Sequence, residues 1–317
     1  MKLIGLMLVR NEQWILGASL RTALKWCDEM VVVDTGSWDN SNRIINEVTG
    51  EQPYRIHYSR MVPTKTVAIK NSYDGVEHDI EQEDLGGWWN EMDVRQHSLQ
   101  LGRRMGGTHF AMVDADEILT ANLISRIYDD IGHLKPGQVI DYPMLAMRRL
   151  DAYQDDGSIW SGVMLSTAFM DRDNLTWRPD GLGYHFHHRC PCGIETVTLK
   201  PLQNKWDGGI MHLQFADQER LRWKHRLYKM IERLRWPSRD PVEQVNWRYG
   251  LALEPAKRVT QIPHEWYYSG MKERIDIDQT PWHKSECRRL WDLYGPEPFK
   301  GLDLWGWPEE SIPRKGG

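Results

Sequence analysis

The hydrophobic residues of the first 120 positions fall into short runs that are separated by stretches with helical spacing. Leu3–Val9 and Met30–Val33 are unbroken apolar runs, which are typical of buried strands, and Tyr54–Tyr58 is a weaker strand candidate. Apolar residues recur at approximately helical spacing over Glu12–Lys25, and another apolar run, His109–Val113, predicts a further strand. Strands that alternate with helices indicate a parallel sheet with right-handed crossovers.

Two more helices are expected in this half of the chain. The residues Asp39-Asn40-Ser41 offer N-caps for a helix that continues to Val48, and a second helix is expected from Trp89 to about Met105. Residues 60–88 form an acidic, glycine-containing insertion of a length typical of lids and binding loops. We therefore expect an α/β fold, with its ligand site beyond the carboxyl ends of the strands.

The alternation ends after residue 116. Ala121–Ile131 is expected to be helical, and Val139–Arg148 and Met164–Met170 are expected to be strands that pair antiparallel. Ala216 to about Arg235 predicts a strong helix, which ends before Pro237 because proline cannot continue a helix. Short helices are expected in the tail. These patterns predict a main domain at residues 1–215 and a helical C-terminal extension at residues 216–317.

The composition narrows the class of protein. The chain has 317 residues, and 40 Lys and Arg against 45 Asp and Glu give a net charge of −5, so no global basic field points to nucleic acid. Four cysteines are too few for a disulfide scaffold, which favours a reducing compartment. No apolar run approaches the roughly 18 residues that cross a bilayer. We expect a soluble, cytoplasmic protein without a membrane partner.

The most informative segment is the acidic end of one predicted strand, Val113-Asp114-Ala115-Asp116-Glu117. Alternate residues of a strand point the same way, so an Asp-x-Asp here projects two carboxylates from one edge of the sheet. Two such oxygen ligands suit Mg²⁺ or Mn²⁺ and, through the metal, a diphosphate. The competing interpretation is that the acids end a strand and cap the next helix. Asn11 and Asp34 also follow predicted strands, which favours a ligand site.

Four segments together resemble the family 2 glycosyltransferases of the GT-A fold. They are Leu8-Val9-Arg10-Asn11-Glu12, Val32-Val33-Asp34-Thr35-Gly36-Ser37-Trp38-Asp39-Asn40-Ser41, Asp93-Val94-Arg95-Gln96-His97 and Val113-Asp114-Ala115-Asp116-Glu117. In that family the corresponding motifs are Lys/Arg-Asn-Glu, Asp-x-Gly-Ser-x-Asp, Ala-Arg-Asn and Asp-x-Asp, in this order. The chain departs from them at Val94-Arg95-Gln96, in the long insertion before it, and at Trp38, where a small residue is usual.

The resemblance implies a GT-A (Rossmann-like) mixed sheet and a metal-dependent, inverting glycosyltransferase with a nucleotide-sugar donor, most often a UDP-sugar. The donor-binding residues that it implies are Asn11, Glu12, Asp34, Gly36, Arg95, Asp114, Lys224 and Arg226. The metal ligands that it implies are Asp114, Asp116 and His212, with Mn²⁺ or Mg²⁺ as the cofactor. A bound cation and a cationic side chain both stabilise the negative charge of the departing diphosphate. Lys224 and Arg226 have an alternative as part of a solvated basic face, and His212 as a core or capping residue.

Direct displacement with inversion needs one general base at the acceptor hydroxyl. In similar enzymes a Trp-x-Gly and then a His-Glu pair occupy the region of Trp177–His188, but the glutamate is missing here. Asp180, His187 and Glu195 are the candidate bases. The same stretch contains five potential zinc ligands, at His185, His187, His188, Cys190 and Cys192. Their spacing is not Cys-x-x-Cys, so an acceptor loop rich in glycine, histidine and cysteine competes with a structural zinc site.

The acceptor stays open between several classes. Residues 218–239 hold eight Lys or Arg against two acids, with aromatic residues between them, and the chain has 16 tryptophans. Such a helix resembles a phosphate-contacting surface, which suggests a hydroxymethylated DNA base as acceptor, as in a phage-type DNA-base glycosyltransferase. The other acceptors are a saccharide or lipid-linked sugar, a protein and a small molecule. A nucleotidyltransferase and a non-catalytic nucleotide- or sugar-binding protein are the alternative functions.

Overall fold

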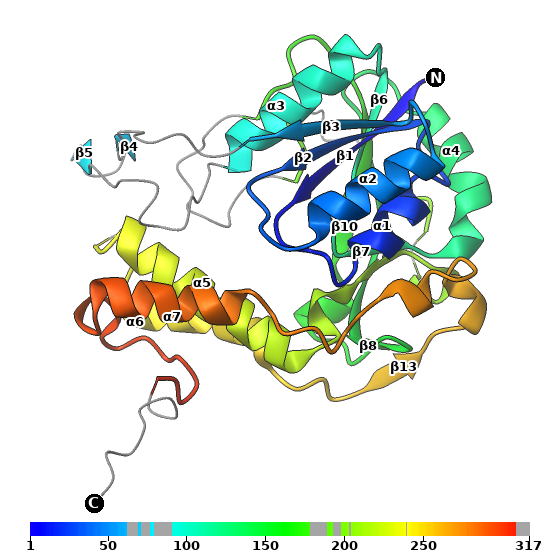
Figure 1. The fold of residues 1–317 in the computed structure, drawn as a ribbon. Helices are drawn as coiled ribbons and strands as arrows, with labels where there is room; N and C mark the ends of the chain where they lie inside the picture. Colours follow the sequence, from blue (N-terminus) through cyan, green and yellow to red (C-terminus); the bar gives the residue numbers. More distant parts are fainter. Residues whose placement is uncertain are drawn as a thin grey trace, which may run out of the picture. The chain divides into compact units, whose positions relative to one another are not determined.

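The protein folds around a mixed β-sheet with helices on both of its faces (Figure 1). The computed structural model describes residues 1–61, 69–70, 77–78, 91–177, 189–192, 198–202, 204–238 and 240–308. The strands are β1 (Leu3–Val9), β2 (Glu29–Asp34), β3 (Ile56–Arg60), β4 (Ile69–Lys70), β5 (Glu77–His78), β6 (His109–Met112), β7 (Glu117–Leu119), β8 (Val139–Arg149), β9 (Ala152–Gln154), β10 (Met164–Met170), β11 (Thr198–Leu199), β12 (Ile210–His212) and β13 (Val259–Gln261).

The order of the strands is that of a Rossmann-like sheet with an antiparallel extension. Over the described residues, eight strands follow the order β13-β9-β8-β10-β6-β1-β2-β3, with β7, β11 and β12 attached beside this path, and β4 and β5 form a separate pair. Strand β1 pairs parallel with both β2 and β6, whereas β10 pairs antiparallel with β6 and β8. The expected α/β fold with a mixed sheet is confirmed.

The unbroken apolar run of β1 is explained by burial on both faces of the sheet. Leu3, Met7 and Val9 join one hydrophobic cluster, and Ile4 and Leu6 join a second cluster. Successive side chains of a strand point to opposite faces, so a strand that is covered on both sides is apolar at nearly every position. The pattern of this segment therefore predicts a central parallel strand.

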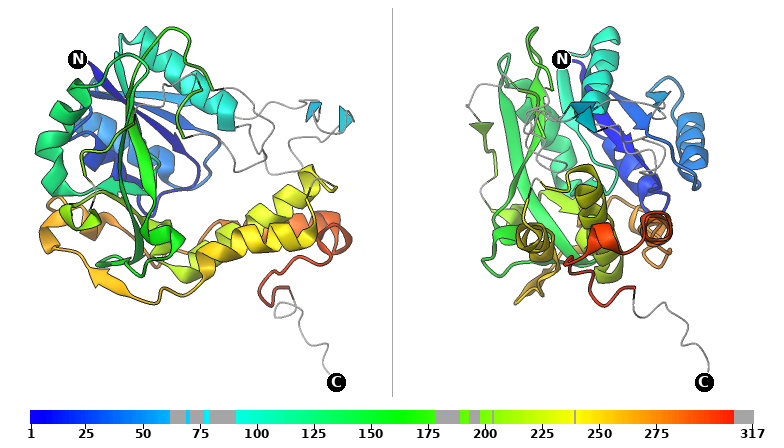
Figure 2. Two further views of the ribbon diagram at one scale, coloured as in Figure 1. Left: turned by 180° about the vertical axis from the view of Figure 1, so that it is seen from behind. Right: turned by 90° about the vertical axis from the view of Figure 1, so that its left-hand side faces the viewer.

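The described residues form seven α-helices, some of which cover the sheet. They are α1 (Leu16–Ala23), α2 (Ser41–Glu51), α3 (Glu91–Arg104), α4 (Ile124–Gly132), α5 (Gln218–Arg235), α6 (Val242–Gly250) and α7 (His283–Tyr294). Helices α1, α2 and α4 contribute to one hydrophobic cluster, and α3 contributes to the other, so α3 covers the opposite face of the sheet from α1 and α2 (Figures 1 and 2). No helix in the described part of the chain is long and apolar enough to cross a membrane.

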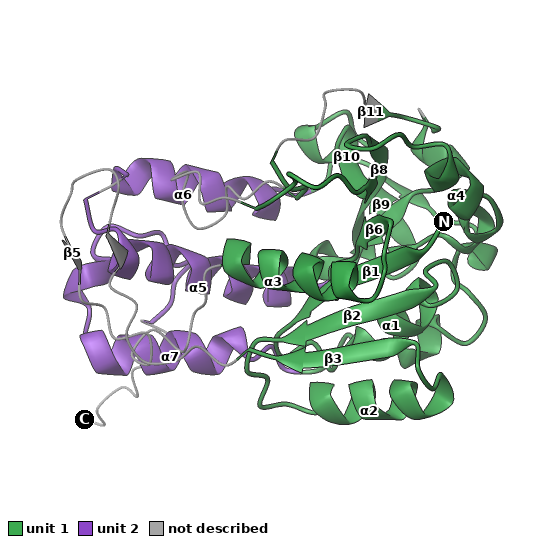
Figure 3. Ribbon diagram, turned by 90° about the horizontal axis from the view of Figure 1, so that it is seen from above, with its two compact units in different colours: residues 1–216, 256–279 green, residues 217–255, 280–317 purple. Residues whose placement is uncertain are grey.

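The chain divides into two compact units (Figure 3). Unit 1 is Met1–Ala216 with Ala256–Gln279, and unit 2 is Asp217–Pro255 with Thr280–Gly317. The sequence pattern placed all of residues 216–317 in one extension, whereas the contacts place 256–279 in unit 1. The reason is that Trp266, Met271 and Ile275 pack into a cluster with Trp14 of the main domain.

The elements expected from hydrophobic patterns lie close to the observed ones, and the short strands were missed. Helix α1 begins at Leu16 instead of Glu12, and the helix predicted at Ala121–Ile131 opens with a 3₁₀ turn at Ala121–Leu123 before α4. Strands β7, β9, β12 and β13 have three residues each, which is too short for a period of two to be recognised. Most of the insertion at 60–88, which we expected to act as a lid or binding loop, lies outside the described residues.

Strand β12 follows a glycine that no other residue can replace without a clash. A Cβ at Gly209 would lie 2.2 Å from the backbone oxygen of Pro143. We expect Gly209→Ala to lower the free energy of unfolding by more than about 2 kcal/mol, because two backbone segments must move apart. Urea denaturation measures this change. Gly50→Ala in α2 is the control, since its Cβ meets nothing within 4 Å, and it should be neutral or stabilising by up to about 1 kcal/mol. Equal stability of the two variants would contradict the prediction.

Candidate functional site

The predicted donor-site residues of unit 1 lie at the edge of the sheet that is formed by the carboxyl ends of its parallel strands. Strand β1 lies between β2 and β6, so the chain leaves β1 toward β2 and β3 on one side and returns to β6 on the other. Ligands in sheets of this kind bind at the carboxyl ends of the strands where the strand order reverses. Asn11 follows β1, Asp34 ends β2 and Asp114 lies two residues after β6. The structure therefore brings these three residues to the edge where the sequence predicted them.

Asn11 and Asp34 hold the turn that follows β2. Asp34 is buried, and its Oδ1 accepts hydrogen bonds from the backbone nitrogens of Gly36 (2.9 Å) and Ser37 (2.7 Å). Gly36 has φ of +100°, a conformation that favours glycine. The backbone nitrogen of Asn11 donates to Ser37 Oγ (2.9 Å), and its Oδ1 accepts from the backbone nitrogen of Trp38 (2.8 Å). The loops after β1 and β2 are thus one hydrogen-bonded unit.

Glu12 is half-buried beside this unit. Its Oε2 accepts from Nε1 of Trp14 (2.6 Å), and its backbone nitrogen donates to Ser41 Oγ (3.0 Å). Ser41 is the first residue of α2, so the contact ties the loop after β1 to the helix after β2. Glu12 therefore has a structural role in addition to the donor contact that the resemblance implies.

Asp114 lies between two arginines. Its Oδ1 accepts from Nη2 of Arg95 (3.2 Å), and its Oδ2 accepts from Nη1 of Arg189 (2.9 Å). Burial by itself would raise the pKa of Asp114, but the positive charges of Arg189 and Arg95 outweigh it and hold the pKa well below its usual value. Arg95 comes from α3, where its Nε also donates to Glu91 (2.9 Å). Asp114 is therefore a charged residue that orients two guanidinium groups.

Arg189 is the site residue that the sequence patterns did not reveal. Its five N–H groups make five hydrogen bonds, to the backbone oxygens of Ser166 and Met112, to Asp114 Oδ2 and to both carboxylate oxygens of Glu117. An arginine with all of its donors engaged is a fixed counter-ion. Its partners Asp114, Glu117 and Met112 lie 72 to 77 residues earlier in the chain, so no local spacing pointed to it.

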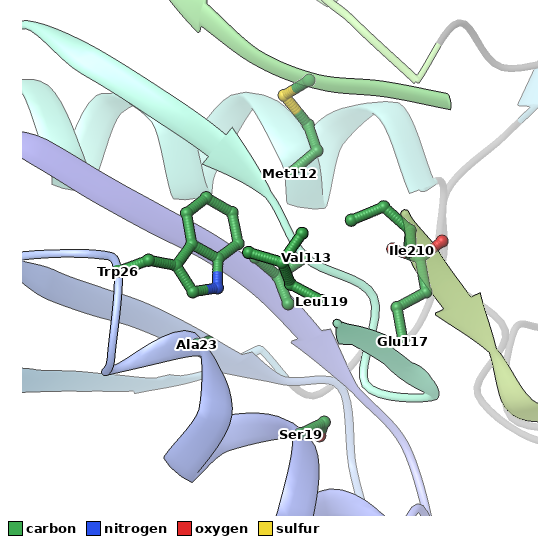
Figure 4. A pocket seen from close by; sticks show the side chains of 8 residues that line it. All are labelled: Ser19, Ala23, Trp26, Met112, Val113, Glu117, Leu119 and Ile210. Atoms are coloured by element: carbon green, nitrogen blue, oxygen red, sulfur yellow. The ribbon is translucent and has the colours of Figure 1, made fainter. Parts of the chain in front are cut away.

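Glu117 is a partner of the site and not a helix cap. It begins β7, it is buried, and its Oε2 also accepts from the backbone nitrogen of Asp114 (3.2 Å). Burial raises the pKa of Glu117, although the charge of Arg189 opposes this effect. Glu117 also lines a cavity of about 10 Å³ between α1, β6 and β12, with Ser19 as its other polar side chain (Figure 4). That volume accommodates about one water molecule, so the cavity is no part of a nucleotide site.

Asp116 and His212 lie side by side although 95 residues separate them in the sequence. Asp116 Oδ1 is 3.5 Å from His212 Nε2, and both side chains are largely buried. Strand β12 brings His212 here by pairing antiparallel with β7, which places His212 opposite Glu117, and the backbone nitrogen of Leu213 donates to the oxygen of Asp116. His212 Nδ1 faces Met144 Sδ at 3.5 Å, so Nε2 is the ring nitrogen on the side of the carboxylate.

The donor set of Asp116 and His212 fits a divalent cation. One carboxylate oxygen and one imidazole nitrogen suit Mn²⁺, whereas Mg²⁺ prefers oxygen alone. Asp114, the third predicted ligand, has both oxygens hydrogen-bonded to arginines, and no group of three His, Cys, Asp or Glu with metal-site geometry occurs among the described residues. The arrangement thus brings together two of the three predicted ligands and gives Asp114 other partners.

The three candidate bases lie outside the described residues. Asp180, His187 and Glu195 belong to segments 178–188 and 193–197, which the structure does not describe, and so do His185 and His188 of the zinc alternative. Cys190 and Cys192 are described and are free thiols. Burial raises the pKa of Cys190 to about 11.

Two basic residues of α5, Arg226 and Lys229, form their contacts within unit 2. Arg226 Nε donates to the backbone oxygen of Leu304 (2.8 Å), and its guanidinium lies 3.9 Å from the ring centroid of Trp223. Lys229 Nζ donates to the oxygen of Asp303 (2.7 Å) and lies 3.7 Å from the ring centroid of Trp305. Burial lowers the pKa of Lys229 to about 8. These two cations hold the C-terminal segment in place.

The exposed surface of α5 therefore carries fewer basic side chains than the sequence of the helix suggests. Arg220 and Arg235 are buried too, Lys224 is half-buried and Arg222 is exposed. Part of the tryptophan excess also packs within unit 2, where Trp307 lies edge-on against Trp223 and Trp291. Lys224 and Arg226 lie in unit 2, whereas the other predicted donor-binding residues lie in unit 1.

Comparisons with known proteins assign no family to the chain. No protein-family model matches it, and no curated protein matches it. Among solved structures it is similar to a protein from Bacillus anthracis, described as a glucose-1-phosphate thymidylyltransferase in complex with sucrose. The two are 11% identical, and the match covers 53% of this chain and 69% of that chain with a TM-score of 0.28. At this TM-score the similarity carries no inference about function.

Proposed function

We propose that this protein is a metal-dependent, inverting glycosyltransferase. It moves a sugar from a nucleotide-sugar, for which a UDP-sugar is the first choice, to an acceptor hydroxyl. The observation that carries the proposal is the pairing of Asp116 with His212 (3.5 Å) beside Asp114 at the carboxyl ends of β1, β2 and β6. In this proposal, the four motifs that resemble those of family 2 glycosyltransferases supply donor-binding residues at this same edge.

The metal site of this proposal consists of Asp116 and His212. A cation bound there supplies positive charge that stabilises the departing nucleoside diphosphate. Asp116 and His212 would hold it through one carboxylate oxygen and Nε2. Both side chains are already close together and largely buried, so little rearrangement opposes binding.

Arg95 supplies a second positive charge for the donor. Its described hydrogen bonds use Nε and Nη2, and Nη1 has no hydrogen-bond partner among the described residues. Asp114 and Glu91 fix the guanidinium, so Nη1 is an oriented pair of N–H donors at the edge of the sheet. Two donors on one nitrogen suit the oxygens of a diphosphate. Arg189 differs, because all of its donors are engaged by the protein.

The acceptor in this proposal is a saccharide or a hydroxymethylated DNA base. The first, a neutral saccharide, requires no basic surface on the protein. The second depends on the basic helix 218–239, in which Arg222, close to the start of α5, is exposed. The burial of Arg226 and Lys229 reduces the charge that this helix offers to phosphate, which favours the saccharide. The general base is proposed among Asp180, His187 and Glu195.

The nucleotidyltransferase alternative receives less support from the loop after β1. An enzyme of that class should carry a glycine-rich phosphate loop with a basic residue there. The residues present are Arg10-Asn11-Glu12, and Asn11 uses its side chain to hold the loop after β2.

Release of UDP from UDP-sugars tests the proposal. The purified protein is incubated with UDP-glucose, UDP-galactose or UDP-N-acetylglucosamine and Mn²⁺, and we expect UDP release that EDTA abolishes. His212→Ala should lower the rate at least about tenfold, because the site loses one of its two protein ligands. Oligosaccharides and hydroxymethylated DNA are then offered as acceptors, and mass spectrometry detects the product. Release of pyrophosphate from UTP and a sugar 1-phosphate, without UDP release from any UDP-sugar, would replace the proposal by the nucleotidyltransferase.

A further inference from the structure

The C-terminal segment of unit 2 is docked on the helices of that unit. We call residues 301–307 the strap; they follow α7 and the 3₁₀ turn after it, and they form no helix or strand. The side-chain amide of Asn246, in α6, donates to the backbone oxygen of Gly301 (3.0 Å) and accepts from the backbone nitrogen of Asp303 (2.8 Å). Leu304 is 6% exposed. The strap is therefore held in unit 2 through its own backbone.

The strap covers a row of basic and aromatic side chains on α5. Trp223, Arg226 and Lys229 are spaced three residues apart, which places them along one side of the helix, and all three are buried. Arg226 Nε donates to the backbone oxygen of Leu304 (2.8 Å), and Lys229 Nζ donates to the backbone oxygen of Asp303 (2.7 Å). The basic and aromatic face that the sequence predicts for this helix is thus present, and the chain's own C-terminal segment lies on it.

The strap offers this face the two kinds of group that a nucleic-acid strand offers. Its backbone oxygens accept hydrogen bonds from cations, as phosphate oxygens do. Its rings lie against the same cations, as bases do: the ring centroid of Trp305 is 3.7 Å from Lys229 Nζ, and that of Trp307 is 5.7 Å from the guanidinium carbon of Arg226. Trp307 also packs edge-on against Trp223. Cations that track a backbone, combined with aromatic rings, are what proteins use to bind single strands.

Docking of the strap has two energetic costs that its release relieves. Trp305 has φ of +51°, in the left-handed region, where a side chain other than glycine is strained. Lys229 is 0% exposed, and burial disfavours its charged ammonium, which lowers the pKa to about 8. Both costs oppose the hydrogen bonds and ring contacts of the docked strap. A ligand that supplies equivalent contacts can therefore compete with it.

We propose that the face of α5 with Trp223, Arg226 and Lys229 is a binding site for single-stranded nucleic acid, and that the strap occupies it as an internal competitor. A strand binds by displacing the strap: its phosphates replace the backbone oxygens of Asp303 and Leu304, and its bases replace the two indole rings. A duplex binds less well, because its bases are already stacked on one another. This site is independent of the proposed function, since no step of glycosyl transfer enters the argument.

A full-length variant with a weakened strap tests the competition. The release variant combines Trp305→Ala with Trp307→Ala, and fluorescence anisotropy measures its affinity for a labelled oligothymidylate of about 15 nucleotides. We expect binding at least about tenfold tighter than that of wild type, because the two rings no longer hold the strap on the cations. Adding Lys229→Ala to the release variant should remove most of the gain. Adding Arg288→Ala instead, an equal loss of charge at an exposed position on α7, should preserve it.

Two results with the release variant would overturn the site. One is wild-type affinity in a variant whose circular dichroism shows intact helices, and the other is an equal gain for a duplex of the same length, which would indicate charge alone. Wild type provides a test that needs no variant. Saturating oligothymidylate should speed hydrogen–deuterium exchange in the strap, where the Asp303 amide loses its bond to Asn246, and slow it in α5. Absence of binding to wild type, or binding without faster exchange in the strap, would also overturn the proposal.

Discussion

Asp116→Ala is expected to lower the rate of UDP release from a UDP-sugar about 1000-fold. Asp116 supplies the only carboxylate of the proposed metal pair, and its Oδ1 lies 3.5 Å from His212 Nε2. A bound cation contributes several kcal/mol to the stabilisation of transition-state charge, and a loss of about 4 kcal/mol corresponds to a factor of about 1000. The initial rate at saturating Mn²⁺ and UDP-sugar is the measurement, and the affinity for Mn²⁺ should fall in parallel.

The control for this prediction is Asp292→Ala. Asp292 is exposed on α7, and its removal changes the net charge of the protein by the same amount. Its rate and metal affinity should equal those of wild type. Full metal-dependent activity in Asp116→Ala would show that the pair of Asp116 and His212 is not the metal site, whatever the control does.

Arg189→Met is expected to lower the free energy of unfolding by about 3–5 kcal/mol. Removal of one partner from a buried ion pair leaves an uncompensated charge, and Arg189 faces both Asp114 Oδ2 (2.9 Å) and Glu117 Oε1 (2.8 Å). Glu117 is 2% exposed, so water cannot replace the lost hydrogen bonds. Equilibrium denaturation in urea, followed by circular dichroism, measures the change.

A double-mutant cycle separates the charge effect from the loss of packing. Glu117→Gln removes the buried negative charge, so the variant that combines Glu117→Gln with Arg189→Met should be more stable than Arg189→Met alone. Arg43→Met is the matched control. Arg43 forms an exposed pair with Glu47, and its loss should cost less than about 0.5 kcal/mol. Additive losses in the cycle, or near-wild-type stability of Arg189→Met, would refute the role of Arg189 as a counter-ion.

The central strands and most of the helices were predictable because their signal is local. The apolar run Leu3–Val9 coincides with β1, and the run Met164–Met170 coincides with β10. A strand that is buried on both faces needs no partner in order to be recognised. By contrast, β7 and β12 have three residues each and exist because they pair with each other. No local pattern distinguishes such segments from loops.

The candidate site likewise contains residues whose position was predictable from the sequence and residues whose position was not. Asn11, Asp34 and Asp114 were predictable as neighbours, because each follows a strand and parallel strands end at one edge. Lys224 and Arg226 were grouped with them through the resemblance, and they lie in unit 2, where Arg226 contacts Leu304 and Trp223. Helical spacing shows which residues share a face of a helix, but it does not show whether that face is exposed.

The sequence by itself determined the α/β architecture and the acidic edge of the sheet, because hydrophobic period and strand-end position are properties of adjacent residues. Only the tertiary structure decided which charges meet at that edge. Arg189 reaches Asp114 across 75 residues, and β12 brings His212 to Asp116. These contacts depend on long-range chain reversals and strand pairings. A buried charge is stable only where the fold brings an oppositely charged or hydrogen-bonding side chain next to it. Because of these pairings Asp114 contacts two arginines, whereas Asp116 contacts His212. The Asp-x-Asp spacing alone does not predict that the two aspartates have different partners.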